Sequence, residues 1–274
     1  MRVHIISDME GVAGIVRVEQ TLGGNEMYEE GRKLYTEEIN AAVRGAKAAG
    51  AKEIVVMDHH GAGEGWSFNS LVHDMLDPAC EYVVQSSWTQ YTEFLEQGCD
   101  ACLLVGMHAM AGTPDGVLSH TVSGRAWQNL RFNGTLVGES AINAAMCGNW
   151  GCPVLLVTGD EAACREAKSL LGDGLTTVAV KKGIGFRAAR NLAPVLAREL
   201  IEEGAKNALS DLDAVRPYDP GRPAEIQVDF VGTGEVDKYR GRAGVEVTGP
   251  RSIVVRAETW WDAWRSLFLE PALA

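Results

Sequence analysis

Short apolar runs alternate with longer stretches in which apolar and charged residues are mixed. Runs of four to eight apolar residues are typical of buried strands, and the mixed stretches are typical of helices that cover a sheet. This alternation favours an α/β fold with a largely parallel sheet flanked by helices. The predicted strands of that sheet are Val3–Ser7, Glu53–Met57, Ala101–Met107, Val154–Thr158 and Thr177–Val180.

The helices are indicated by their start and stop signals. The stretch 26–49 is rich in Glu, Lys, Arg and Ala, and Gly50 ends it. Asp160 is a suitable N-cap for a helix that starts at Glu161, and Pro194 suits the first turn of a helix that runs towards Leu209. Each of these predicted helices connects or follows predicted strands, as a parallel sheet requires.

The last part of the chain differs in pattern. Asn133-Gly134, between two apolar runs, predicts a hairpin turn. A stretch rich in proline and glycine, 217–223, is the clearest linker. We therefore expect a larger α/β domain over 1–215 and a smaller C-terminal α+β unit over 224–274, packed against it or as part of the same domain. Its predicted elements are strands at 226–231, 245–247 and 252–256, and a helix around Trp260, Trp261 and Trp264.

Composition narrows the class of partner. The chain has 274 residues and a formal net charge of −12, and 46% of its residues are hydrophobic. A strongly acidic protein lacks the basic surface that binding to nucleic acid or to an anionic membrane requires. The N-terminus has no signal-peptide pattern, and no apolar stretch approaches the roughly 18 residues of a membrane span. We expect a cytoplasmic protein that binds neither nucleic acid nor membrane.

The six cysteines lie in or beside apolar runs, so we expect them to be reduced and buried. Cys99 and Cys102 have the CxxC spacing of zinc and redox sites. No second CxxC pair and no thioredoxin-like context accompanies them. We therefore expect no zinc or redox role for this pair.

Metal-binding side chains follow three of the predicted strands. Asp8 and Glu10 come directly after the first strand, His59 and His60 after the second, and His108 after the third. Ligands of open parallel sheets bind beyond the carboxyl ends of the strands. These side chains should therefore meet in one crevice. Spacing alone does not decide between His59 and His60, because neighbouring residues of a strand face opposite ways.

Glu139 starts a predicted helix of small residues and extends this set of candidate ligands. Nitrogen and oxygen ligands suit Zn²⁺, and also Mn²⁺ or Co²⁺. Five side chains exceed the three that a single catalytic zinc usually takes, so two ions bridged by a carboxylate fit the number better. His120 lies outside this set and could transfer a proton or stabilise an oxyanion.

The chain also resembles the M55 family of metallopeptidases over almost its whole length. The resemblance rests on an ordered series of motifs: Ser7–Gly11, Tyr28–Arg32, Thr36–Glu38, Asp58–His60, Gly106–Ala109, Ser119–Thr121, Asn133-Gly134, Val137–Glu139 and Val157–Asp160. Two positions depart from the founding member's pattern. His59 replaces a serine, and the loop 21–25 has a different sequence.

The resemblance implies a dinuclear zinc aminopeptidase that releases N-terminal D-amino acids, such as D-Ala, from short peptides or amides. It implies that Asp8 bridges two zinc ions, whose other ligands are Glu10, His60, His108 and Glu139, and that His120 is the catalytic histidine. We expect a metal-activated water to be the nucleophile, with His120 assisting, because attack by an imidazole on an amide is unusual. The resemblance also implies a homo-oligomer, in the form of a ring-shaped decamer.

Two other hypotheses fit the same residues. A dinuclear metal site also serves small-molecule amidases and phosphoesterases, although the chain has no clear phosphate-binding loop. A non-enzymatic protein that binds metal or peptide would keep the ligands and would not need His120.

Overall fold

The computed structural model describes residues 1–63, 65–85 and 91–268. A seven-stranded sheet forms its centre, in the order β3-β2-β1-β4-β7-β8-β9, and only β9 runs antiparallel to its neighbour. The predicted α/β class with a largely parallel sheet is confirmed. The strands of this sheet are β1 (Arg2–Ser7), β2 (Glu53–Asp58), β3 (Glu81–Val83), β4 (Ala101–Met107), β7 (Val154–Asp160), β8 (Thr176–Gly185) and β9 (Ala188–Asn191).

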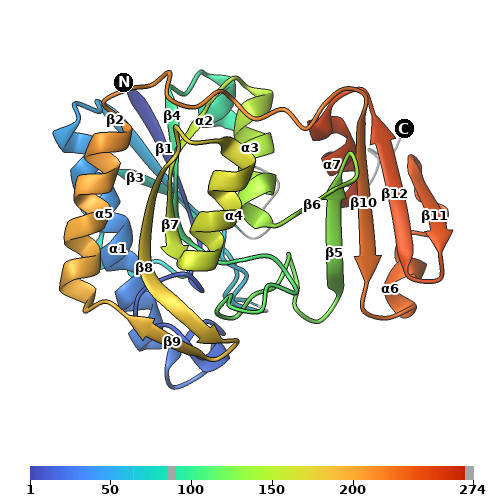
Figure 1. Ribbon diagram of the computed structural model, residues 1–274, viewed down its shortest axis with the longest axis horizontal. Helices are drawn as coiled ribbons and strands as arrows, with labels where there is room; N and C mark the ends of the chain where they lie inside the picture. Colours follow the sequence, from blue (N-terminus) through green and yellow to red (C-terminus); the bar gives the residue numbers. More distant parts are fainter. Residues whose placement is uncertain (64, 86–90, 269–274) are drawn as a thin grey trace.

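Helices cover both faces of this sheet (Figure 1). On one face α1 packs against α5, and on the other α3 packs against α4. The central strands β1 and β4 are buried almost throughout, since they have neighbours on both edges and helices on both faces. The helices are α1 (Tyr28–Ala48), α3 (Glu139–Asn149), α4 (Glu161–Leu171) and α5 (Pro194–Ala208).

A second sheet of five antiparallel strands lies beside the first, in the order β11-β12-β10-β5-β6 (Figure 1). α7 packs against β10 and β12 of this sheet and also contacts α3. Two of its strands, β5 and β6, precede the proline-rich stretch, so this sheet combines residues from both predicted domains. Its elements are β5 (Trp127–Phe132), β6 (Thr135–Val137), β10 (Ala224–Phe230), β11 (Val245–Gly249), β12 (Ser252–Ala257) and α7 (Trp260–Phe268).

Several predicted elements are confirmed closely. The hairpin at Asn133-Gly134 joins β5 to β6, and both turn residues have the positive φ that such a turn requires, 45° and 83°. β8 runs to Gly185, further than the predicted Val180, because it continues into a hairpin with β9. Short elements without a clear pattern were not predicted: η1 (Val18–Gln20), η2 (His73–Met75), α2 (Glu93–Glu96), α6 (Gly234–Asp237), and strands β3 and β9.

All six cysteines are free thiols, as expected, but Cys80 and Cys99 are partly exposed, contrary to the expectation that all six are buried. Both lie in loops near the sheet surface rather than inside strands. No helix within the described residues is long and apolar enough to cross a membrane.

Candidate metal centre

Backbone hydrogen bonds join the carboxyl ends of β1 and β4. The amide of Asp8 donates to the carbonyl of Val105 at 2.8 Å, and the amide of Gly11 donates to the carbonyl of Gly106 at 2.8 Å. Gly106 has a φ of +77°, and a side chain there would collide with the carbonyl of Asp8. Glycine at this position therefore allows the Asp8 carboxylate to reach His108, the first residue after β4.

The five predicted ligands meet at this edge of the sheet, and we call them the ligand cluster: Asp8, Glu10, His60, His108 and Glu139. The two oxygens of Asp8 face different histidines, with Oδ1 at 3.1 Å from His60 Nδ1 and Oδ2 at 3.2 Å from His108 Nε2. Glu10 Oε2 lies 3.2 Å from the same nitrogen of His60. Glu139 Oε1 lies 3.3 Å from the same nitrogen of His108. Two histidine–carboxylate groups therefore share Asp8.

Backbone carbonyls orient both histidines of the ligand cluster. His60 Nε2 donates to the carbonyl of Thr21 at 2.6 Å, and His108 Nδ1 donates to the carbonyl of Ala109 at 2.9 Å. When neutral, each ring therefore has its lone pair on the nitrogen that faces the carboxylates. A hydrogen bond on the outer nitrogen is the usual way to orient a metal-binding histidine.

The electrostatics of the ligand cluster are dominated by its carboxylates. Burial alone would raise the pKa of Asp8, but its contacts with His108 and His60 outweigh burial and hold that pKa well below its usual value. Burial likewise opposes protonation of His60 and His108, yet the neighbouring carboxylates hold both pKa values well above the usual range. The cluster thus attracts positive charge strongly.

The ligand cluster fits divalent metal ions. Glu10 Oε2 and His108 Nε2 are buried and have no hydrogen-bond partner among the described residues. Ligand atoms of Asp8, Glu10 and His108 all lie within 4.8 Å of one another. Buried polar atoms are normally paired, and a set of nitrogen and oxygen donors is one that zinc prefers. His60, His108, Asp8 and Glu10 are buried, while Glu139 is partly exposed.

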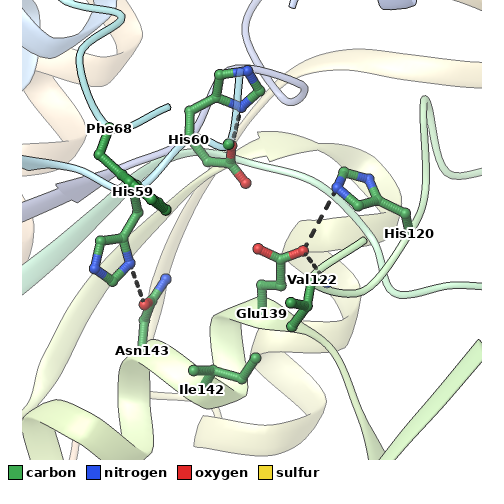
Figure 2. Close-up of a pocket in the computed structure, with 10 residues that line it drawn as sticks. His59, His60, Phe68, His120, Val122, Glu139, Ile142 and Asn143 are labelled. Atoms are coloured by element: carbon green, nitrogen blue, oxygen red, sulfur yellow. Dashed lines mark hydrogen bonds and ion pairs between the residues drawn. The ribbon is translucent and has the colours of Figure 1, made fainter. Parts of the chain in front are cut away.

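His120 lies at the rim of the ligand cluster, in the loop between β4 and β5 (Figure 2). Its ring stacks on that of His108 with the centroids 4.1 Å apart, and its Nε2 lies 3.7 Å from Glu139 Oε1. Its Nδ1 donates to the carbonyl of Leu118 at 2.8 Å. The sequence predicted His120 outside the ligands, yet the structure brings it within 4.8 Å of ligand atoms of His108 and Glu139.

A small cavity of about 100 Å³ opens beside the ligand cluster (Figure 2). Its polar wall includes His59, whose Nδ1 lies 2.9 Å from Asn143 Oδ1, so His59 points away from the metal ligands. Its apolar wall consists of Phe68, Val122 and Ile142. Phe68 and Val122 have φ values of 60° and 61°, which are strained for such side chains and often mark functional sites.

Sequence reasoning missed several residues that hold this site. Asp58 Oδ1 accepts from the amide of His60 at 3.0 Å and from the Tyr35 hydroxyl at 2.9 Å. Asp160 Oδ2 accepts from the amide of Val117 at 2.8 Å and so anchors the loop that carries His120. The signal for Asp58 was an acidic residue at the end of an apolar strand. For Asp160, the sequence pattern predicts only a helix N-cap.

The chain is similar to known proteins over its whole length. The M55 peptidase family model, described as D-aminopeptidase, matches residues 1–269. The chain belongs to the M55 peptidase family. A D-aminopeptidase of Bacillus subtilis (strain 168) is 30% identical over 276 residues, which are 100% of this chain and 98% of that protein.

A solved structure has nearly the same fold. It is the Zn-dependent D-aminopeptidase DppA from Bacillus subtilis, described as a self-compartmentalizing protease. The two chains match with a TM-score of 0.90 at 29% identity, over 98% of this chain and 96% of that one. The resemblance predicted from the motifs is thereby confirmed, and with it the enzyme class, a peptidase among the hydrolases.

Proposed function

We propose that this M55 peptidase is a dinuclear zinc aminopeptidase that releases N-terminal D-amino acids, such as D-Ala, from short peptides or amides. The observation that carries the proposal is the position of Asp8 between His60 and His108, with one carboxylate oxygen towards each. The Zn-dependent D-aminopeptidase that matches this chain supports the metal and the substrate class. Mn²⁺ and Co²⁺ suit the same ligands.

In this proposal each zinc ion has its own side of the ligand cluster. Asp8, Glu10 and His60 would hold one ion, and Asp8, His108 and Glu139 the other. The distances between these side chains, 3.1–3.3 Å, support that grouping because each histidine nitrogen has two carboxylate oxygens beside it. Two bound ions would polarise the scissile carbonyl and lower the pKa of an attacking water.

His120 is the residue we assign to proton transfer. Its Nδ1–H donates to Leu118, so a neutral ring has the lone pair on Nε2, and the residue lines the cavity. From there it can accept a proton from the attacking water and deliver it to the leaving amine. The stack against His108 fixes the plane of the ring, and the ring is partly exposed, so substrate can reach it.

The size of the cavity supports a substrate whose N-terminal side chain is small. Phe68, Val122 and Ile142 close its apolar side, and its volume of about 100 Å³ suits a small side chain. We also propose a homo-oligomer, a ring-shaped decamer, on the basis of the self-compartmentalizing relative. The cytoplasmic location expected from the sequence stays a prediction.

The decisive experiment compares matched D- and L-aminoacyl amides on the zinc-loaded protein. We expect hydrolysis of D-Ala amide, loss of activity with a chelator, and recovery when zinc is added. Phosphate esters are included in the same panel. Absence of cleavage for every aminoacyl substrate would reject the aminopeptidase, and turnover of phosphate esters alone would indicate a phosphoesterase.

A further inference from the structure

Four of the six cysteines meet at the opposite end of the parallel sheet from the ligand cluster. They come from three segments: the loop and strand around the start of β4, the C-terminal end of α3, and the residues just before β7. We call them the thiol cluster: Cys99, Cys102, Cys147 and Cys152. Cys102, Cys147 and Cys152 are buried, and Cys99 is partly exposed.

The backbone explains why these segments meet. Cys102 pairs with Val154 in the parallel ladder, and the amide of Cys102 donates to the carbonyl of Pro153 at 2.8 Å. This register places Cys152 beside the residues that lead into β4, at the spacing of neighbouring strands, about 4.8 Å. The amide of Cys152 in turn donates to the carbonyl of Cys147 at 3.1 Å, which folds the end of α3 back on the same place.

The thiols lie next to one another in series. Cys99 and Cys152, Cys152 and Cys147, and Cys147 and Cys102 are each close enough to shift one another's pKa. Among the described residues, no group of three or more potential metal ligands within 4.8 Å of one another includes a cysteine. A linear series of contacts favours bonds between pairs of sulfur atoms over a tetrahedral metal site.

The CxxC of Cys99 and Cys102 therefore has the second pair that the sequence did not reveal. The partners, Cys147 and Cys152, are separated by four residues rather than two, and they reach the CxxC only through the packing of α3 and β7 on β4. No residue of the thiol cluster belongs to the ligand cluster or lines its cavity. The proposed aminopeptidase reaction leaves these thiols unused.

We propose that the thiol cluster is a redox-sensitive site, in which a peroxide oxidises Cys99 and Cys152 to a disulfide. The Cys99 sulfur attacks one peroxide oxygen and becomes a sulfenic acid, with release of one water. The Cys152 sulfur then displaces the hydroxyl of the sulfenic acid, the disulfide forms, and a second water leaves. Two thiols and one hydrogen peroxide thus give one disulfide and two waters.

Cys147 can take part by exchange. Its thiolate attacks the Cys152 sulfur, a Cys147–Cys152 disulfide forms, and Cys99 leaves as a thiolate that takes up the proton lost by Cys147. Cys99 is the entry point because the other three thiols are buried. The neighbouring Cys152 thiol and then burial raise the pKa of the Cys99 thiol. The thiol is therefore protonated at neutral pH, and the cluster stays reduced until peroxide is abundant.

A Cys99–Cys152 disulfide would cross-link the start of β4 to the segment before β7. β4 leads directly to His108 of the ligand cluster. A cross-link across a long loop restricts the unfolded chain and raises stability. Oxidation would thus make the fold more resistant to heat, and reduction would remove that effect.

The test treats the full-length, zinc-loaded protein with hydrogen peroxide, blocks the remaining thiols under denaturing conditions, and maps the peptides by mass spectrometry. We expect a linked pair, Cys99–Cys152 or Cys147–Cys152, with loss of two hydrogen atoms and reversal by dithiothreitol. Where the linked pair is Cys99–Cys152, which closes the long loop, the thermal midpoint should rise by roughly 5 °C.

Variants test which cysteines form the disulfide. Cys152→Ser removes the sulfur shared by both pairs and should abolish the linked peptides and the thermal shift. Cys80→Ser, at a partly exposed thiol outside the cluster, is the matched control and should retain both. If Cys152→Ser does not fold, Cys99→Ser serves instead and should slow the oxidation at least tenfold. Peroxide that oxidises Cys80 while the cluster thiols all remain free would overturn the proposal.

Discussion

The ammonium group of Lys181 donates hydrogen bonds to the carbonyls of Glu10, Val12 and Ile15, at 2.5, 2.9 and 2.6 Å. Lys181 is only 2% exposed, and burial lowers its pKa to about 8. All three of its N–H donors are thus used by one segment, the loop that carries Glu10 after β1. β8 therefore fixes the backbone of a proposed metal ligand from the far side of the loop.

Lys181→Met should loosen this loop while it preserves the bulk of the side chain. Three buried carbonyls would lose their donor, so we expect the free energy of unfolding to fall by about 3 kcal/mol and zinc to bind more weakly. Denaturant unfolding and zinc titration measure the two effects. Lys182→Met is the matched control, since Lys182 is exposed and pairs with Glu161 at 3.3 Å. Equal zinc affinities in the two variants would contradict a positioning role for Lys181.

Because Asp8 lies between His60 and His108, variants of the ligand cluster should differ in how much zinc they lose. Asp8→Asn should weaken both sites, because each oxygen of Asp8 faces a different histidine. Glu10→Gln should remove the ion beside His60 and leave the other, so zinc content falls from about two ions per chain to about one. Elemental analysis after gel filtration measures the content. Full occupancy in both variants would exclude these residues from the ligands.

The sequence predicted the ligand cluster better than it predicted the residues that support it. Each proposed ligand is polar and directly follows an apolar strand or starts a helix, so its position could be read from the chain. Strand order then guarantees that the ends of β1, β2 and β4 are neighbours. Gly106 and Gly11, which allow the close approach, have no pattern that distinguishes them from turn glycines.

The supporting residues depend on contacts between distant segments. Lys181 was not predicted because the strand was expected to end at Val180, one residue before it. Cys147 and Cys152 gave no sign of lying beside Cys99, since only the register of β4 with β7 brings them there. Likewise, the hairpin of β5 and β6 was predicted locally, but its pairing with β10 is set by tertiary packing.

His120→Ala should separate catalysis from metal binding. If His120 transfers protons, kcat should fall by about 10²–10⁴ while the zinc content stays the same. The variant leaves Glu139 in contact with His108, at 3.3 Å, so that side of the cluster keeps its ligands. His73→Ala, at an exposed histidine remote from the cluster, is the control. A loss of zinc in the His120 variant would instead identify His120 as a ligand.

Ile142→Ala should enlarge the cavity and broaden the substrate range. Ile142 closes the apolar side of the cavity together with Phe68 and Val122. Removal of its side chain leaves room for branched residues, so kcat/KM for D-Leu amide relative to D-Ala amide should rise about tenfold or more. Steady-state kinetics on both amides give the ratio. A ratio that does not change would place the N-terminal side chain outside this cavity.

The buried carboxyl group of Glu38 should make the stability of the fold depend on pH, and this effect does not involve the metal ligands. It is 2% exposed, its Oε1 accepts from the amide of Ala13 at 2.9 Å, and burial raises its pKa from 4.5 to about 7. Between these two values the folded chain keeps a proton that the unfolded chain releases. The fold therefore loses stability as pH rises through this window, by about 3 kcal/mol in total.

Glu38→Gln keeps the hydrogen-bond acceptor for Ala13 and removes the titration. The variant should therefore gain stability relative to the natural chain between pH 4.5 and pH 7.5, by up to about 3 kcal/mol. Denaturant unfolding of both proteins at several pH values gives the difference directly, because titrations common to the two cancel. A difference that stays constant across the window would mean that Glu38 is ionised in the fold and that Lys181 or Arg198 neutralises it.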